Sequence, residues 1–103
     1  MTYERQMTTA AAADLESIDD YIAVSLDAPA AASNLMTEID ASIKRACENP
    51  YLYRLSRLDS LRQKGYRCII VKNYVILYLV DEANHRIIIV RVFYGAMDYE
   101  KYV

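Results

Sequence analysis

Apolar side chains recur at spacings of three and four residues in two stretches of the chain, from about residue 9 to 25 and from about 29 to 48. This is the period of an amphipathic helix. Thr8 or Thr9 suits the N-cap of the first helix, because a hydroxyl accepts from the exposed amides of the first turn. Pro29 suits the first turn of the second helix. The pattern predicts an antiparallel helical hairpin.

The C-terminal part of the chain has a different pattern, made of short apolar runs rich in Val, Ile, Tyr and Phe. Such runs are typical of strands. The predicted strands cover residues 68–71, 74–80 and 87–93. Tight turns join them at Lys72 and Asn73 and at residues 82–85, and Asn73 suits the left-handed backbone that a two-residue hairpin loop requires.

Residues 2–7 are mixed and partly β-branched, which favours a first edge strand. The predicted order is therefore strand, helix, helix and a three-stranded meander, within one domain of residues 1–103. The expected fold is α+β, with the helical hairpin packed on one face of a small twisted antiparallel sheet. The opposite face of the sheet is expected to be open to a ligand or a partner.

Composition fits an ordinary globular protein, since 54% of the 103 residues are hydrophobic and 25% are charged. No apolar run approaches the roughly 20 residues of a membrane-spanning helix, and the first residues are too polar for a signal peptide. We expect a cytoplasmic protein with no membrane contact. Cys47 and Cys68 lack the spacing of metal ligands, so free thiols are expected, with no metal and no cofactor.

Charge is divided unevenly along the chain. Residues 1–43 carry one basic and eight acidic side chains, a net charge of −7, whereas residues 44–103 carry eleven basic and six acidic ones, a net charge of +5. Such a division indicates either binding of nucleic acid or an acidic partner, or two solvated helix faces packed on a basic sheet. The acidic cluster from Asp14 to Asp20 is interpreted as a solvated helix face rather than as paired catalytic carboxylates.

Residues 51–64 have no clear period and are expected to form an ordered loop with a helical turn around residues 59–61. Arginine and lysine alternate there with tyrosine and leucine. One interpretation is a phosphate-binding surface. The other, slightly favoured, is a loop that covers the edge of the core with Tyr and Leu while its basic side chains face water.

Several short motifs occur in a characteristic order over nearly the whole chain. They are Ala13, Asp14 and Leu15 with Tyr21 and Ile22 in the first helix; Pro29, Ala30 and Ala31 at the start of the second and Asn49 and Pro50 at its end; and, in the sheet, Gly65, Tyr66 and Arg67, then Val71, Lys72, Asn73 and Tyr74, then Tyr78, Val80, Asp81 and Glu82, and finally Arg91, Val92, Phe93, Tyr94 and Gly95 with Asp98 and Tyr99. In this order and spacing the chain resembles the RelE/ParE family of bacterial toxins from type II toxin–antitoxin pairs.

The resemblance implies a growth inhibitor that a cognate antitoxin keeps silent, of the kind associated with plasmid stabilization. The antitoxin of such a pair typically wraps an extended segment around the toxin and pairs it with the sheet or the helices. Operator DNA is then bound only through the antitoxin. RelE-like members enter the ribosome and cleave mRNA, whereas ParE-like members inhibit DNA gyrase, and fold alone does not choose between them.

A nuclease of this family must activate a ribose hydroxyl, stabilise the negative phosphorane and protonate the leaving oxygen. By position, the resemblance assigns these catalytic roles to Arg67, Arg91, Tyr94 and Tyr102. The candidates for contact with substrate or partner are the interleaved basic residues of the segment 51–64, with three further residues of the turn and the C-terminal end: Arg54, Arg57, Arg62, Lys64, Lys72, Asp98 and Tyr99. The basic set is incomplete, however, because Ile69 and Val75 stand where family nucleases carry bases, and the single histidine, His85, falls in a predicted turn.

Each of these residues also has a purely structural interpretation. Arg91 can pair with Asp98 or with a helix carboxylate, and Tyr94 can be an aromatic side chain at the core edge. Lys72 can be an ordinary turn residue, and Asp98 can cap a C-terminal turn. Because the nuclease set is depleted, inhibition of gyrase is favoured slightly over ribosome-dependent mRNA cleavage. A third hypothesis is an inactive toxin fold that serves only as an antitoxin-binding co-repressor.

Overall fold

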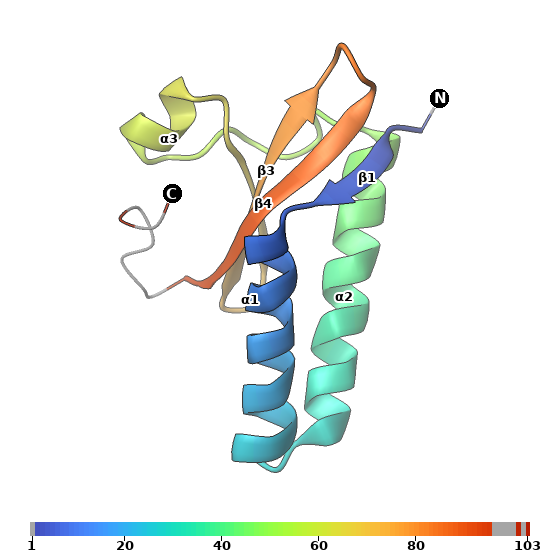
Figure 1. Ribbon diagram of the computed structural model, residues 1–103, viewed down its shortest axis with the longest axis vertical. Coiled ribbons are helices and arrows are strands. Elements are labelled where there is room, and N and C mark those ends of the chain that lie inside the picture. The colour runs from blue at the N-terminus through green and yellow to red at the C-terminus, as the bar shows by residue number, and fades with distance from the viewer. Residues whose placement is uncertain (1, 96–100, 102) are drawn as a thin grey trace.

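A computed structural model of the chain describes residues 2–95, 101 and 103 (Figure 1). The elements follow in the order β1 (Glu4–Met7), α1 (Thr9–Asp20), the π-helical segment η1 (Tyr21–Ser25), α2 (Pro29–Glu48), α3 (Asp59–Gln63), β2 (Arg67–Val71), β3 (Tyr74–Asp81) and β4 (Arg86–Tyr94). The predicted order of strand, two helices and three-stranded meander is confirmed. None of the helices in these described ranges has the length and apolarity needed to span a membrane.

The helical hairpin forms as the sequence predicts. Thr8 is the N-cap of α1, and its hydroxyl accepts from the amide of Ala11. Pro29 opens α2, which ends at Glu48. The two helices lie side by side and antiparallel in Figure 1. An ion pair of 2.5 Å between Arg5 of β1 and Asp40 ties the first strand to the outer side of α2.

The sheet has the strand order β1-β4-β3-β2, and it is mixed rather than fully antiparallel. The meander is antiparallel, but β1 pairs parallel with β4. The expectation of a purely antiparallel sheet was therefore wrong for one strand. The reason is topological, because the two antiparallel helices bring the chain back to the end of the sheet at which β1 begins. As a result β1, β2 and β4 all run in the same direction.

The two turns occur where the sequence places them, with one correction. The left-handed residue of the first hairpin is Lys72, with φ of 53°, and not Asn73. In the second turn His85 has φ of 56°. His85 lies in the predicted turn but is half-buried, since its ring stacks on Tyr3 at 3.8 Å between centroids.

The helical face of the sheet holds the larger core, in which strand residues such as Ile76, Tyr78 and Ile89 pack against Leu35 and Ile39 of α2. The sequence analysis expected the second face of the sheet to be open, and this expectation was wrong. A smaller core covers it, formed by Val75, Leu77 and Phe93 of the sheet with Leu61 of α3 and, at its margin, Leu58 and Tyr66. In Figure 1, α3 and α2 accordingly lie on opposite sides of the sheet. Leu58 and Leu61 of the segment 51–64 thus cover the core as one interpretation expected, and the phosphate-binding interpretation of its basic residues stays a prediction.

Candidate functional site

A β-bulge sets the direction of Arg91. On β3 and β4, Leu77 pairs with Arg91 but the next residue, Tyr78, pairs with Ile89, so Val90 is an extra residue in β4. Side chains alternate between the two faces of a strand, and one inserted residue reverses the alternation. Without the bulge Arg91 would share the helical face with Ile89. With it, Arg91 shares the second face with Phe93, and its guanidinium lies 4.5 Å from the centre of the Phe93 ring.

The guanidinium of Arg91 reaches around the edge of the sheet to Asp14 of α1. Its Nε and Nη2 donate to the two carboxylate oxygens at 2.7 and 2.9 Å. The pair is largely shielded from water, with side-chain exposures of 25% and 15%. Hydrogen bonding to the Asp14 carboxylate raises the pKa of Arg91. Of the structural interpretations of Arg91, pairing with a helix carboxylate is therefore confirmed.

The same carboxylate also closes the edge of the sheet. The strand β1 pairs with β4 only as far as Ile89, so farther along β4 no strand in the described part of the chain lies on that side. Asp14 accepts from the amide of Val92 at 2.9 Å. A backbone donor that would otherwise need water or another strand is thereby satisfied. The sequence analysis placed Asp14 on a solvated helix face, and that interpretation was wrong for this residue.

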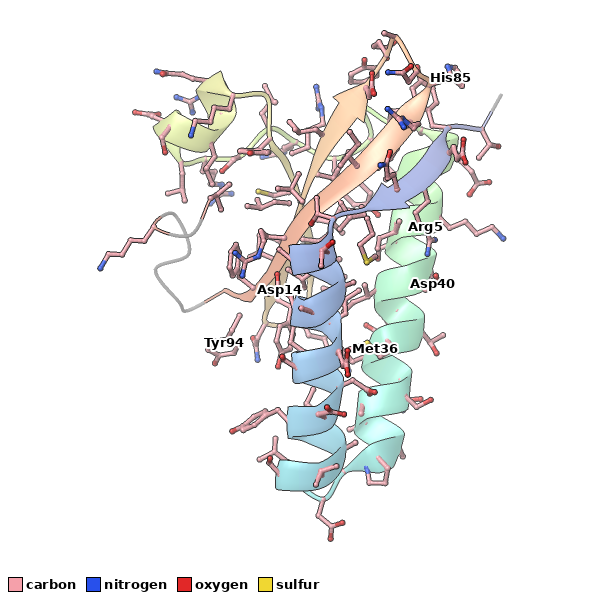
Figure 2. All side chains as sticks on the ribbon, in the orientation of Figure 1. Arg5, Asp14, Met36, Asp40, His85 and Tyr94 are labelled. Atoms are coloured by element: carbon pink, nitrogen blue, oxygen red, sulfur yellow. The ribbon has the colours of Figure 1, made fainter. Side chains whose placement is uncertain are left out.

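A groove of about 730 Å³ lies beside this ion pair, between the first helix and the end of β4. Tyr21 and Leu26 line it on the helical side, and Tyr74 and Tyr94 line it on the sheet side. Tyr94 is 48% exposed, and its ring meets Tyr74 edge to face at 5.7 Å. In Figure 2, Asp14 and Tyr94 lie on the same side of the molecule. The surface of this groove is mainly apolar and aromatic, which suits contact with a protein.

Arg67, the other predicted catalytic arginine, lies on the opposite face of the sheet. Because side chains alternate along β2, Arg67 lies on the same face as Ile69, which is the helical face, and Cys68 lies on the other. The loop that follows α2 contacts Arg67 on this face. Its Nη1 donates to the carbonyl of Tyr53 at 2.7 Å, and its guanidinium lies 4.8 Å from the centre of the Tyr51 ring. The sheet thus separates Arg67 from Arg91, and the two side chains do not converge on one reacting group.

A cluster that the sequence analysis did not identify joins three distant segments near Arg67. The hydroxyls of Tyr3 and Tyr51 both donate to the Glu82 carboxylate, the first at 2.9 Å. These hydrogen bonds hold the pKa of Glu82 below its ordinary value and raise the pKa of both tyrosines. The cluster fastens β1 and the loop after α2 to the tip of the β3–β4 hairpin.

The remaining basic residues are dispersed. Arg54, Arg57, Arg62 and Lys64 are exposed on the segment that covers the second face, and Arg62 pairs with Asp59 within α3. Lys72 is an exposed turn residue 3.8 Å from Glu38. Asp98, Tyr99 and Tyr102 lie outside the described residues. Across the described residues no group of three His, Cys, Asp or Glu side chains could hold a metal ion.

The thiols of Cys47 and Cys68 are both free, as the sequence predicts. Burial raises the pKa of each one, so neither is an activated nucleophile. Among the functional residues, sequence reasoning missed the role of Asp14. The signal was present in the spacing, because Asp14 follows Ala11 by three residues and precedes Ile18 by four, and both of these contact the core.

Comparison with known proteins identifies the family of the chain. A family model described as the ParE toxin of the type II toxin–antitoxin system parDE matches residues 6–99. The chain belongs to this toxin family. No curated protein matches it in sequence.

Two solved toxin–antitoxin structures share the fold of this ParE-family toxin. One is the chromosomal ParDE system of P. aeruginosa, with a TM-score of 0.69 and 24% identity over 88% of this chain and 94% of that one. The other is the RelBE2 toxin–antitoxin complex of Mycobacterium tuberculosis, with a TM-score of 0.63 and 18% identity over 91% of this chain and 99% of that one. The chain is thus a type II toxin of the ParE/RelE family with an α+β fold.

Proposed function

We propose that this toxin inhibits growth by acting on DNA gyrase and that it does not cleave RNA itself. The observation that carries the proposal is the separation of Arg67 from Arg91, which lie on opposite faces of the sheet, each bound to the protein's own groups. Cleavage of a phosphodiester requires positive charge and proton-transfer groups that converge on one phosphate.

The state of each arginine supports the same conclusion. To stabilise a phosphorane, Arg91 would have to leave a two-point ion pair with Asp14, and the Asp14 carboxylate would then repel the phosphate. Arg67 would have to leave the Tyr53 carbonyl and the Tyr51 ring. His85 offers no general base in their place, because it stacks on Tyr3 at the tip of the β3–β4 hairpin.

The groove beside Asp14 and Arg91 gives the toxin a surface for a protein target. Exposed Tyr21, Leu26 and Tyr94 surround it, and aromatic and apolar side chains around a hollow are the usual centre of a protein interface. We assign the contact with gyrase to this groove. The toxin then acts in the cytoplasm, as one member of a plasmid-stabilization type of pair. Its cognate antitoxin binds and neutralises it in the cytoplasm. Operator DNA is bound only through that antitoxin.

The test is a supercoiling assay with purified toxin and gyrase, run beside pulse-labelling of DNA and protein synthesis in cells that express the chain. We expect loss of supercoiling and an early halt in DNA synthesis while translation continues. A prompt halt in translation with cleaved mRNA would favour a ribosome-dependent nuclease. Undisturbed growth with folded protein would leave only an inactive binding module.

A matched pair of variants tests whether this groove is the surface that contacts gyrase. Leu26 and Leu52 are exposed to similar extents, 55% and 51%, but only Leu26 lines the groove. Leu26→Ser is expected to weaken inhibition of gyrase about tenfold, the effect of losing about 1.4 kcal/mol of contact. Leu52→Ser should leave inhibition unchanged. Equal effects of the two variants would contradict the assignment.

A further inference from the structure

The π-helical segment η1 brings two apolar side chains to the groove beside Asp14. The amide of Leu26 donates to the carbonyl of Tyr21 at 3.0 Å, which is the i→i+5 hydrogen bond of a π-helical turn. In a regular α-helix residues five apart point about 140° away from each other, because each residue turns the helix by about 100°. A π-helical turn holds more residues, so residues five apart lie nearly above one another. Tyr21 and Leu26 can therefore both line the groove.

The same turn carries an exposed apolar surface at the end of the helical hairpin. Tyr21 and Leu26 are both 55% exposed, and Val24 between them is 76% exposed, the largest value among the large apolar side chains of the described residues. In Figure 1 this end of the hairpin projects beyond the sheet. A group of exposed apolar side chains that adjoins a groove is typical of a surface that binds a partner.

Three tyrosine rings line the groove, that of Tyr21 on the helical side and those of Tyr74 and Tyr94 on the sheet side. The face of an aromatic ring attracts a cation, and a guanidinium group stacks on it more often than an ammonium group does. The wall of the groove already contains one such contact, because the guanidinium of Arg91 lies 4.5 Å from the centre of the Phe93 ring. The exposed rings of Tyr21 and Tyr94 offer the same kind of contact to a partner.

Acidic side chains without a basic partner lie beside this surface. The sequence has no lysine or arginine between Arg5 and Lys44. Asp20 precedes Val24 by four positions, and the amide of Asp27 donates to the carbonyl of Val24 at 3.2 Å, so both carboxylates are close to the exposed valine. Both are exposed, and no basic side chain among the described residues pairs with either one. The charge here is negative and uncompensated.

We propose that the groove receives an arginine side chain from a basic surface of the target protein. The guanidinium group lies against the rings of Tyr21 and Tyr94. Basic groups around that arginine lie beside Asp20 and Asp27, and apolar groups cover Leu26. Arginine is among the side chains that contribute most to protein interfaces, and its planar group combines charge with stacking. The inference rests on the proposed action on gyrase and specifies the chemistry of the surface that gyrase presents.

The charge of this surface disfavours the other kinds of occupant. Asp20 and Asp27 would repel the phosphates of a nucleic acid or of an anionic membrane. Arg91 does not offset this repulsion, because Asp14 already binds it through two hydrogen bonds. A purely apolar protein surface would remove water from the two carboxylates without giving them partners. A basic protein surface with a protruding arginine matches both the rings and the charge.

The first experiment measures the affinity of the full chain for assembled gyrase and compares two variants of Tyr94. Tyr94→Leu keeps an apolar side chain but removes the ring, and is expected to weaken binding about fivefold or more. Tyr94→Phe keeps the ring and should bind within about twofold of the parent chain. An aliphatic side chain of the partner would tolerate leucine and phenylalanine equally, so equal affinities of the two variants would overturn the arginine contact. Thermal unfolding of each variant controls for folding.

A second pair of variants tests the charge at constant net charge change. Asp20→Asn with Asp27→Asn removes two carboxylates beside the groove, and asparagine suits the φ of 50° at position 27. Glu4→Gln with Glu48→Gln removes two exposed carboxylates, in β1 and at the C-terminal end of α2, which do not line the groove. Only the first pair should weaken gyrase binding about fivefold or more and reduce its dependence on salt. The second pair should bind within about twofold of the parent chain.

The outcomes separate this contact from the proposed function. A parent chain that does not bind gyrase overturns the target and the contact together. A parent chain that inhibits gyrase while Tyr94→Leu binds as well as Tyr94→Phe overturns the arginine contact alone. Unchanged or stronger binding after loss of Asp20 and Asp27 shows that the partner surface is neutral or acidic, and it overturns the basic surface while gyrase remains the target.

Discussion

Two strand ends in this sheet, those of β4 and β2, lack a neighbouring strand on one side and differ in what their outward groups contact. At the end of β4, beyond the reach of β1, the Asp14 carboxylate occupies the amide of Val92 and is itself fixed by Arg91. At the end of β2, the outward groups of Ile70 meet solvent under an apolar side chain that is 72% exposed. The difference shows that a charged residue inside an apolar strand can serve to close an edge, whereas an ordinary isoleucine can mark the edge that remains open.

Proline substitution should reveal the difference most strongly. Val92→Pro removes an amide that Asp14 binds, at a side chain only 2% exposed, and is expected to lower the free energy of unfolding by about 3 kcal/mol or more. Ile70→Pro should cost about 1 kcal/mol, since its amide faces solvent. Denaturant unfolding of both variants measures the contrast.

Val92→Ala is the control for this comparison, because it measures the packing that any substitution of Val92 loses. The excess of the proline variant over the alanine variant is the contribution of the backbone. If Ile70→Pro destabilises the protein as much as Val92→Pro does, then the edge at β2 is not open.

The carboxylate that closes the β4 edge should be the next most sensitive position. Asp14→Ala leaves the Arg91 guanidinium without its carboxylate and the Val92 amide without its acceptor, at an expected cost of about 2 kcal/mol. Asp20→Ala, on the exposed surface of the same helix, should change stability by less than about 0.5 kcal/mol.

A double-mutant cycle with Arg91→Met sharpens this result. Coupling of about 1 kcal/mol or more between the two positions is expected, because the two side chains form one two-point interaction. Equal costs of Asp14→Ala and Asp20→Ala in equilibrium unfolding would show instead that Asp14 is only a solvated helix residue.

A buried hydroxyl holds the start of the segment 51–64. Tyr78 is fully buried and donates to the Pro50 carbonyl at 2.8 Å, so Tyr78→Phe should cost about 1 kcal/mol at neutral pH. Burial raises the pKa of Tyr78 from 10.0 to about 12. The folded protein therefore retains this proton at a pH where the unfolded chain has lost it.

Stability from Tyr78 is consequently complete below pH 10 and is lost as the pH rises toward about 12. The expected loss is about 2–3 kcal/mol. The unfolding free energy measured against pH should be flatter over this interval in Tyr78→Phe than in the parent chain. Parallel profiles for the two proteins would show that Tyr78 does not hold its proton against alkali.

The smallest effect is expected at Glu82, which fastens the far ends of β1 and the loop after α2. Hydrogen bonds from Tyr51 and Tyr3 lower its pKa below 4.5. The stabilisation is therefore present above pH 4.5 and is lost as the pH falls through the lower folded value. Glu82→Gln should reduce the steepness of acid unfolding, whereas Glu48→Gln, at an exposed position, should not. Identical acid midpoints for all three proteins would contradict this role.

Local patterns were sufficient for the elements of the fold. The period of the apolar residues, the Thr8 cap and Pro29 located both long helices, and the apolar runs located the three strands of the meander. Turn chemistry was predicted less well, since Lys72 and not Asn73 adopts the left-handed conformation. Backbone preferences of single residues are weak compared with the register that the paired strands impose.

The candidate site was beyond the reach of such patterns. Arg67 and Arg91 are correctly recognised as unusual in apolar strands, but a single inserted residue at Val90 decides which face Arg91 occupies. Nothing in the local sequence distinguishes an arginine that binds a phosphate from one that pairs with a carboxylate at the edge of a sheet. The roles of Asp98, Tyr99 and Tyr102 stay predictions.

The sequence by itself determined the helices, the strands, their order and the resemblance to a toxin family, because these depend on neighbouring residues and on short motifs. Only the tertiary structure decided the parallel pairing of β1, the covering of the second face by α3 and the union of Asp14 with Arg91, which are 77 residues apart. The physical reason is that edges, faces and ion pairs of a sheet are made by segments that meet only when the chain has folded.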